Sequence, residues 1–223
     1  MELNELLSIR PGLTAIIGSG GKTTAMYTLA GELTRRGRVI CCTTTHILPP
    51  QRLPVLTAPT AQTLAEALER SRCLCVGTPS EGGKLAAPAL PMAELTALAD
   101  YVLVEADGSR GLPIKAHLPH EPVIPSEADQ TVLVVGASGF GRPISQAVHR
   151  PERFCRLTGL APGDAVTPEA AARVIAAEGL AHRVLVNQVE DREADRLARR
   201  LAGELTCPAY AGAMQRRIWY CLS

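Results

Sequence analysis

The stretch from Gly18 to Thr23 carries residue types that can bind the phosphates of a nucleotide. It reads Gly-Ser-Gly-Gly-Lys-Thr, and its glycines allow the backbone to curl so that successive N–H groups face one anion. Lys22 could then reach the outer phosphates, and the hydroxyl of Thr23 could bind Mg²⁺. With Ser19, Gly20, Gly21 and Thr24, this stretch forms the predicted nucleotide-binding loop.

One position departs from the usual phosphate-loop pattern, which is Gly, four residues of any kind, then Gly-Lys-Ser/Thr. The first glycine should stand at position 16, which is Ile16. The alternative is a glycine-rich turn that binds nothing. The flanks favour the phosphate loop, because residues 13–17 predict a buried strand and the apolar spacing over 22–36 predicts a helix. We interpret Ile16 as the mark of a subclass in which the chain enters the loop from a bulkier strand end. We also expect Lys22 to be exposed and dispensable for folding.

A second group of polar residues follows the apolar run at 101–104, which predicts another buried strand. Glu105, Asp107 and Gly108 come directly after it. Carboxylates suit Mg²⁺, and a glycine three residues after an acid is the spacing with which nucleotide switches sense the terminal phosphate. We expect Glu105 as a magnesium partner and Asp107 at the metal or orienting water, without a firm ranking between them. An acidic turn is the alternative.

Weaker candidates lie near other predicted strand ends. Thr44 could complete the magnesium shell, although a capping or turn role suits it equally. Arg110 and Lys115 could stabilise charge on a transferring phosphoryl group or bind an anionic second substrate, and solvated loop charges are the equal alternative. His117 and His120 do not form a metal pair, because Pro119 prevents a helical face.

Asn187 ends the apolar run 183–186 and is predicted to contact the base. GTPases with a phosphate loop place Asn-Lys-x-Asp at such a strand end, whereas this chain has Gln188 and Glu190 at the second and fourth positions. The base is therefore left open between those of ATP and GTP.

The elements that must position these residues alternate along the chain. Strands are predicted at 13–17, 38–43, 73–76, 101–104, 131–135 and 183–186, and helices at 22–36, 60–70, 92–99, 151–158, 168–178 and 191–205. This alternation predicts an α/β fold with a mainly parallel sheet and helices on both faces. We expect one domain over residues 1–223, a P-loop NTPase-like three-layer sandwich, with a small β-hairpin at 81–84.

Composition excludes several classes of protein. Hydrophobic residues make up 46% and charged residues 20%, as in an ordinary globular protein. A net charge of +1 and 3% aromatics argue against a nucleic-acid partner. Residues 1–5 lack the basic start of a signal peptide, and no apolar run could span a membrane. The 7 cysteines mostly fall in apolar segments, which indicates buried, reduced thiols and a cytoplasmic location.

Four stretches together resemble the YqeC family, the accessory proteins of selenium-dependent molybdenum hydroxylases: GSGGKTT, TTTH, VEADGSRGLPIKAH and VHRPERFCRLTGL. They lie in the family's order, and the resemblance extends from residue 14 to about residue 190, which is most of the chain. The glycine loop alone is also similar to that of the Mur ligases, which lack the first glycine too. The family resemblance implies a P-loop fold and cytoplasmic work in maturing or inserting a selenium-containing molybdenum cofactor.

The expectation is a Mg²⁺-dependent protein that binds and hydrolyses ATP or GTP, with a molybdenum hydroxylase or its cofactor as partner. Hydrolysis would switch the loop around Gly108. One alternative is a kinase or ligase that activates a small molecule held by Arg110 and Lys115. Another is a nucleotide-binding chaperone with negligible turnover.

Overall fold

The structure is a computed structural model that describes residues 1–222. Contacts between residues group the chain into two compact units. Unit 1 contains residues 1–16, 23–107 and 123–130. Unit 2 contains residues 17–22, 108–122 and the chain from 131 onward. The residues of the glycine loop and those after the acidic strand end are each divided between the two units.

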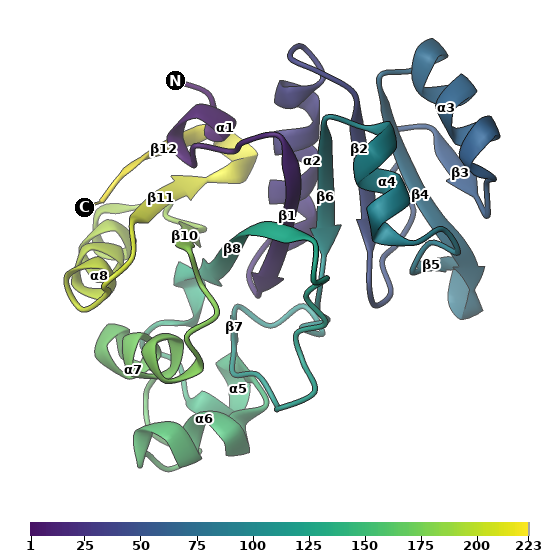
Figure 1. Ribbon diagram of the computed structural model, residues 1–223. Coiled ribbons are helices and arrows are strands. Elements are labelled where there is room, and N and C mark those ends of the chain that lie inside the picture. The colour runs from purple at the N-terminus through teal and green to yellow at the C-terminus, as the bar shows by residue number, and fades with distance from the viewer. Residues whose placement is uncertain (223) are drawn as a thin grey trace. The chain divides into compact units, whose positions relative to one another are not determined.

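Unit 1 is built on parallel strands in the order β1-β6-β2-β4-β3 (Figure 1). Their bounds are Gly12–Gly18, Tyr101–Glu105, Val39–Thr43, Cys73–Ser80 and Val55–Thr57. β6 and β2 are buried along their whole length, as expected for parallel strands covered on both faces. The register sets Glu105 opposite Ile16 of β1 and opposite Thr43 of β2.

Helices cover both faces of this part of the sheet. On one face, Leu64 and Leu68 of α3 and Leu95 of α4 join a core with Ile40 and other strand residues. On the other face, Cys41 and Cys75 lie beside Tyr27 of α2. The helices are α1 (Leu3–Leu6), α2 (Lys22–Leu33), α3 (Ala61–Arg70) and α4 (Met92–Leu98). The predicted hairpin is present, since β4 pairs antiparallel with β5 (Lys84–Ala86) across a turn at Glu81–Gly83.

Unit 2 has the strand order β8-β10-β11-β12 (Figure 1), with β12 antiparallel and the others parallel. Its strands are β8 (Ala128–Gly136, whose first residues belong to unit 1), β10 (Arg183–Asn187), β11 (Ala209–Ala213) and β12 (Ile218–Cys221). Its helices are α5 (Ile144–Ala147), α6 (Pro151–Thr158), α7 (Pro168–Glu178) and α8 (Arg192–Gly203). Single turns of 3₁₀ helix lie at Ala137–Gly139 and Met214–Arg216, and a separate parallel pair joins β7 (Ile114–Lys115) to β9 (Val148–His149).

The predicted α/β fold class is confirmed: a mainly parallel sheet is flanked by helices. The helix starts follow the expected capping chemistry, because Thr60, Thr167 and Asp191 each accept a hydrogen bond from the backbone N–H three residues later. The cysteine prediction holds for Cys41, Cys42, Cys73 and Cys75, which are buried, but Cys221 is exposed. Within residues 1–222, no helix combines the length and apolar character needed to cross a bilayer.

The sequence pattern did not predict several short elements, nor the hairpin that β11 forms with β12. The short ones, α1, α5, β3, β7 and β9, hold two to four residues each, too few to display a period. β11 was missed because its sequence, AYAGA, lacks the β-branched residues typical of strands. Small residues are required there, since a Cβ on Gly212 would lie 2.6 Å from the carbonyl oxygen of Ile218.

Candidate functional site

The glycine loop of unit 2 adopts a backbone conformation that only glycines reach easily. Gly20 has φ +88° and Gly21 has φ +124°. A Cβ on Gly20 would lie 2.4 Å from the backbone nitrogen of Gly136, so the loop is also packed too closely for any side chain at that position. Ile16 is fully buried within β1, which continues to Gly18. The missing first glycine therefore falls on ordinary strand, and the turn begins only at Gly18.

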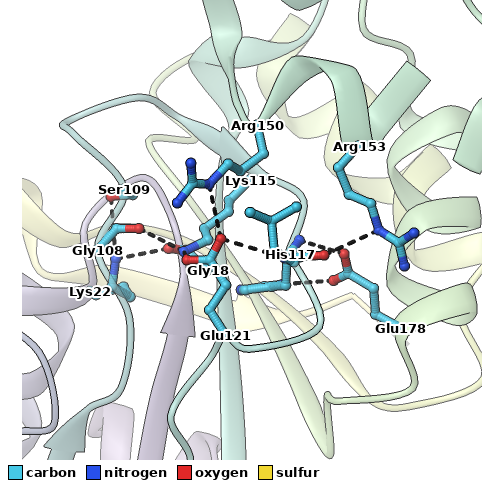
Figure 2. Close-up of polar contacts among 11 residues, drawn as sticks. Gly18, Lys22, Gly108, Ser109, Lys115, His117, Glu121, Arg150, Arg153 and Glu178 are labelled. Carbon is cyan, nitrogen blue, oxygen red and sulfur yellow. Dashed lines mark hydrogen bonds and ion pairs between the residues drawn. The ribbon is translucent and has the colours of Figure 1, made fainter. Parts of the chain in front are cut away.

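Lys22 curls back onto its own loop. Its Nζ donates to the carbonyl oxygen of Gly18 at 2.8 Å and to Oγ of Ser109 at 3.3 Å (Figure 2). The expectation of an exposed lysine is wrong, because Lys22 is 4% exposed. The reason is this loop curvature, which folds the long side chain over the glycines instead of into solvent.

Two side chains tie the loop to the rest of unit 2: Ser19 of the loop itself, and Asn187 at the end of β10. Ser19 is buried, its N–H donates to Val134 at 2.8 Å, and its hydroxyl donates to the carbonyl of Leu112. Asn187 uses both ends of its amide: Nδ2 donates to the carbonyl oxygen of Gly20 at 2.7 Å, and Oδ1 accepts from the N–H of Met214 at 3.1 Å. Asn187 is thus a brace of the loop in this structure, and its contact with a base stays a prediction.

Unit 1 brings together two predicted magnesium ligands. The hydroxyl of Thr23, in the first turn of α2, donates to Oε2 of Glu105 at 2.7 Å. Both groups offer oxygen atoms as metal ligands, and Glu105 is only 7% exposed. Among residues 1–222, no three or more His, Cys, Asp or Glu side chains are arranged to hold a metal ion. A hydroxyl and one carboxylate nevertheless fit nucleotide-bound Mg²⁺, which is usually held by one or two protein oxygens and the phosphates.

The other unit 1 candidates have different surroundings. Asp107 is fully buried. Thr44 donates its hydroxyl to the carbonyl of Val123 at 2.8 Å, whereas Thr43 donates to the backbone oxygen of Glu105 at 2.7 Å. Thr43 thereby fixes the end of β6, a role that the sequence reasoning did not assign. Thr24 is exposed in the first turn of α2.

Lys115 of unit 2 is buried and ion-paired, which rules out the interpretation of a solvated loop charge. Its Nζ donates to the carbonyl oxygen of Gly108 at 2.7 Å and pairs with Oε2 of Glu121 at 2.8 Å (Figure 2). Arg150 donates from Nε to the other oxygen of Glu121 at 3.0 Å. Burial alone would raise the pKa of Glu121, but the hydrogen bonds and charges of Lys115 and Arg150 outweigh it and lower that pKa. Arg110 is exposed.

His149 is a further buried group of this cluster. It stands opposite Lys115 in the β7–β9 register, so both side chains lie on the same face of that pair. Burial lowers the pKa of His149, and the charges of Lys115 and Arg150 lower it further. The sequence reasoning missed Glu121, His149 and Arg150 as parts of a site. The only available signal was that His149 and Arg150 open one of the family-like stretches.

Comparison with known proteins places the chain. The model of the YqeC protein family matches residues 14–152, more than half of the sequence. The chain is 35% identical over 161 residues to the uncharacterized protein YqeC of Escherichia coli strain K12, an alignment that spans 69% of this chain and 63% of that relative. The matched region contains the glycine loop, the acidic strand end and the Lys115 cluster, and the chain belongs to the YqeC family.

Proposed function

We propose that this protein binds ATP or GTP together with Mg²⁺ and hydrolyses it. The observation that carries the proposal is the curled loop of residues 18–22, with its positive-φ glycines and a lysine folded over them. Such a loop presents several backbone N–H groups to one anion and adds a fixed positive charge. A polyphosphate is the ligand class that uses all of these features.

The roles of the residues follow from their chemistry. Lys22 exchanges its bonds to Gly18 and Ser109 for bonds to phosphate oxygens. Thr23 and Glu105 hold the magnesium ion directly or through water. A Mg²⁺ ion held there would neutralise charge on the phosphates as water attacks the terminal phosphorus and the bond to the departing nucleoside diphosphate breaks. Asp107 orients the attacking water.

Nucleotide state would be communicated through the segment after Asp107. Ser109 bonds to Lys22, and the carbonyl of Gly108 accepts from Lys115. A phosphate that binds Lys22 removes the hydrogen bond from Lys22 to Ser109, and this segment is then held by the bond from Lys115 to Gly108. In this way, hydrolysis would time docking to a client. Following the family resemblance, we propose a selenium-dependent molybdenum hydroxylase, or its cofactor, as that client.

The second candidate is a kinase or ligase that passes a phosphoryl group to a small molecule. The Lys115–Glu121–Arg150 cluster favours it, because it holds a buried lysine and a half-exposed arginine together around one carboxylate. Phosphate that appears on an added acceptor, rather than in solution, would distinguish this candidate from simple hydrolysis.

The test is a comparison of matched lysine variants in the full chain. Lys22→Met should weaken binding of fluorescent ATP and GTP analogues about 10- to 100-fold, the worth of one or two charge-assisted hydrogen bonds. Lys84→Met, at the exposed first residue of β5, should leave affinity unchanged. Because Lys22 is buried, circular dichroism must show that its variant is folded. A folded Lys22→Met protein with wild-type affinity for both nucleotides would disprove the phosphate-loop assignment.

A further inference from the structure

A cavity in unit 2 is lined by residues that lie apart from the glycine loop in the sequence. Its volume is about 200 Å³, below the range of pockets for drug-sized ligands, so it suits only a small molecule. Leu118, Pro119, Ala177 and Leu180 form apolar parts of its wall. Its polar lining consists of His117, Glu121, Arg153 and Glu178.

Glu178 fixes His117 in one orientation. One carboxylate oxygen accepts from the backbone N–H of His117 at 2.6 Å, and the other lies 2.7 Å from Nδ1 (Figure 2). Because a carboxylate accepts, Nδ1 carries the proton. Glu178 is the last residue of α7, where the helix dipole disfavours an anion. The two bonds from His117 offset that cost, and together they make this wall of the cavity rigid.

Arg153 is held by His117. Its Nε donates to the carbonyl oxygen of His117 at 3.2 Å (Figure 2). Within residues 1–222, the structure gives its two Nη atoms no hydrogen-bond or ion-pair partner. The Nη edge of a guanidinium matches the two oxygens of a carboxylate or phosphate. The cavity is therefore lined by an arginine whose position is fixed through one nitrogen while its fork remains available.

Both carboxylates of the cavity lining already have cationic or histidine partners. Glu121 is already paired with both Lys115 and Arg150, and Glu178 is paired with His117. Arg153 is thus the permanent cation of the cavity lining, and neither carboxylate of that lining pairs with it. An anion is thus the complementary ligand.

We propose that this cavity is a binding site for a small metabolite with an apolar body and one oxyanion group. The Nη edge of Arg153 binds the oxyanion, and the leucine, proline and alanine walls take the body. Glu178 acts as a positioning residue, because it orients the segment at His117 to which Arg153 is anchored. The assignment does not depend on nucleotide binding, and its test contains no nucleotide.

The test uses calorimetric titration of the full chain with hexanoate and with hexyl phosphate, which share a body and differ in the oxyanion. Saturable binding of at least one is expected, and the tighter of the two identifies the oxyanion. Arg153→Met should weaken that binding at least 10-fold. Arg156→Met, an exposed arginine on the same helix, should change it less than 2-fold. Arg153→Lys, which keeps the charge without the fork, should restore part of the affinity.

Location is checked by the imidazole NMR signals. Ligand binding should shift the ring signals of His117, assigned with a His117→Gln variant, while those of His182 stay in place. An alkyl phosphate bound at the glycine loop would instead respond to Lys22→Met and not to Arg153→Met. Absence of saturable binding of both ligands, equal losses in the two arginine variants, or an unshifted His117 signal would each overturn the proposal.

Discussion

Asn187 provides a sharp test of how the loop is held. Asn187→Ala removes the donor to the carbonyl of Gly20 and the acceptor for the N–H of Met214. Asn187 is 5% exposed, so water replaces these partners poorly. Each buried group left without a partner costs roughly 1–3 kcal/mol. The expected loss is therefore about 2–6 kcal/mol, or roughly 4–24 °C in melting temperature for a chain of this size.

Asn187→Asp separates the two bonds. It keeps an oxygen for Met214, but sets a carboxylate oxygen where Nδ2 now lies 2.7 Å from the carbonyl oxygen of Gly20. Two acceptors at that distance repel each other, so the aspartate variant should be at least as unstable as the alanine variant. Gln62→Ala, which removes an exposed amide on α3, is the control and should stay within about 0.5 kcal/mol.

The assay is thermal unfolding of the nucleotide-free protein, followed by circular dichroism. If Asn187 serves only to contact a base, neither variant will change the melting temperature without nucleotide, and only nucleotide affinity will fall. Wild-type melting of Asn187→Ala would refute the brace. An aspartate variant more stable than the alanine variant would refute the repulsion at Gly20.

Three further predictions concern the loop, the metal and pH. Gly20→Ala should abolish nucleotide binding, since its Cβ would meet the backbone of Gly136 at 2.4 Å; titration with a fluorescent nucleotide checks this, and retained affinity contradicts it. Thr23→Ala and Glu105→Gln should each raise the Mg²⁺ concentration needed for half-maximal nucleotide binding about 10-fold. Glu105→Gln keeps an oxygen that can accept from Thr23, so this variant should melt no lower than wild type. Unchanged magnesium titrations would show that neither residue belongs to the metal site. Burial and neighbouring cations lower the pKa of His149 in the folded protein. As pH falls below about 6.5, the unfolded chain therefore takes up a proton on this histidine before the folded chain does, and stability is lost. The melting temperature of His149→Asn should depend less on pH between 6.5 and 5 than that of wild type, and an equal dependence would contradict the assignment.

Much of the fold could be predicted from the sequence, because its elements are encoded locally. Buried parallel strands appear as short apolar runs, and amphipathic helices appear as apolar residues at helical spacing. Both signals need only neighbouring residues, so the bounds of α6 and α7 match the predicted ranges. The same local reasoning located the glycine loop, since a strand, glycines, Lys22 and a helix follow one another directly.

What the sequence could not supply is which distant groups meet. Asn187 and Gly20 are 167 positions apart, and no period or spacing relates them. Lys22 and Lys115 looked like loop charges, because burial of a lysine depends on partners that other segments bring: Ser109 for one, and Glu121 for the other.

The sequence by itself determined the types and order of the longer elements and marked the glycine loop as a candidate for binding phosphate, since these depend on backbone preference and side-chain periodicity. Only the tertiary structure decided that Asn187 braces the loop, that Glu121 joins two cations and that Arg153 lines a separate cavity. Hydrogen bonds and ion pairs form over about 3 Å. Whether two side chains come that close is decided by strand register and helix packing across the whole chain, which local sequence does not contain.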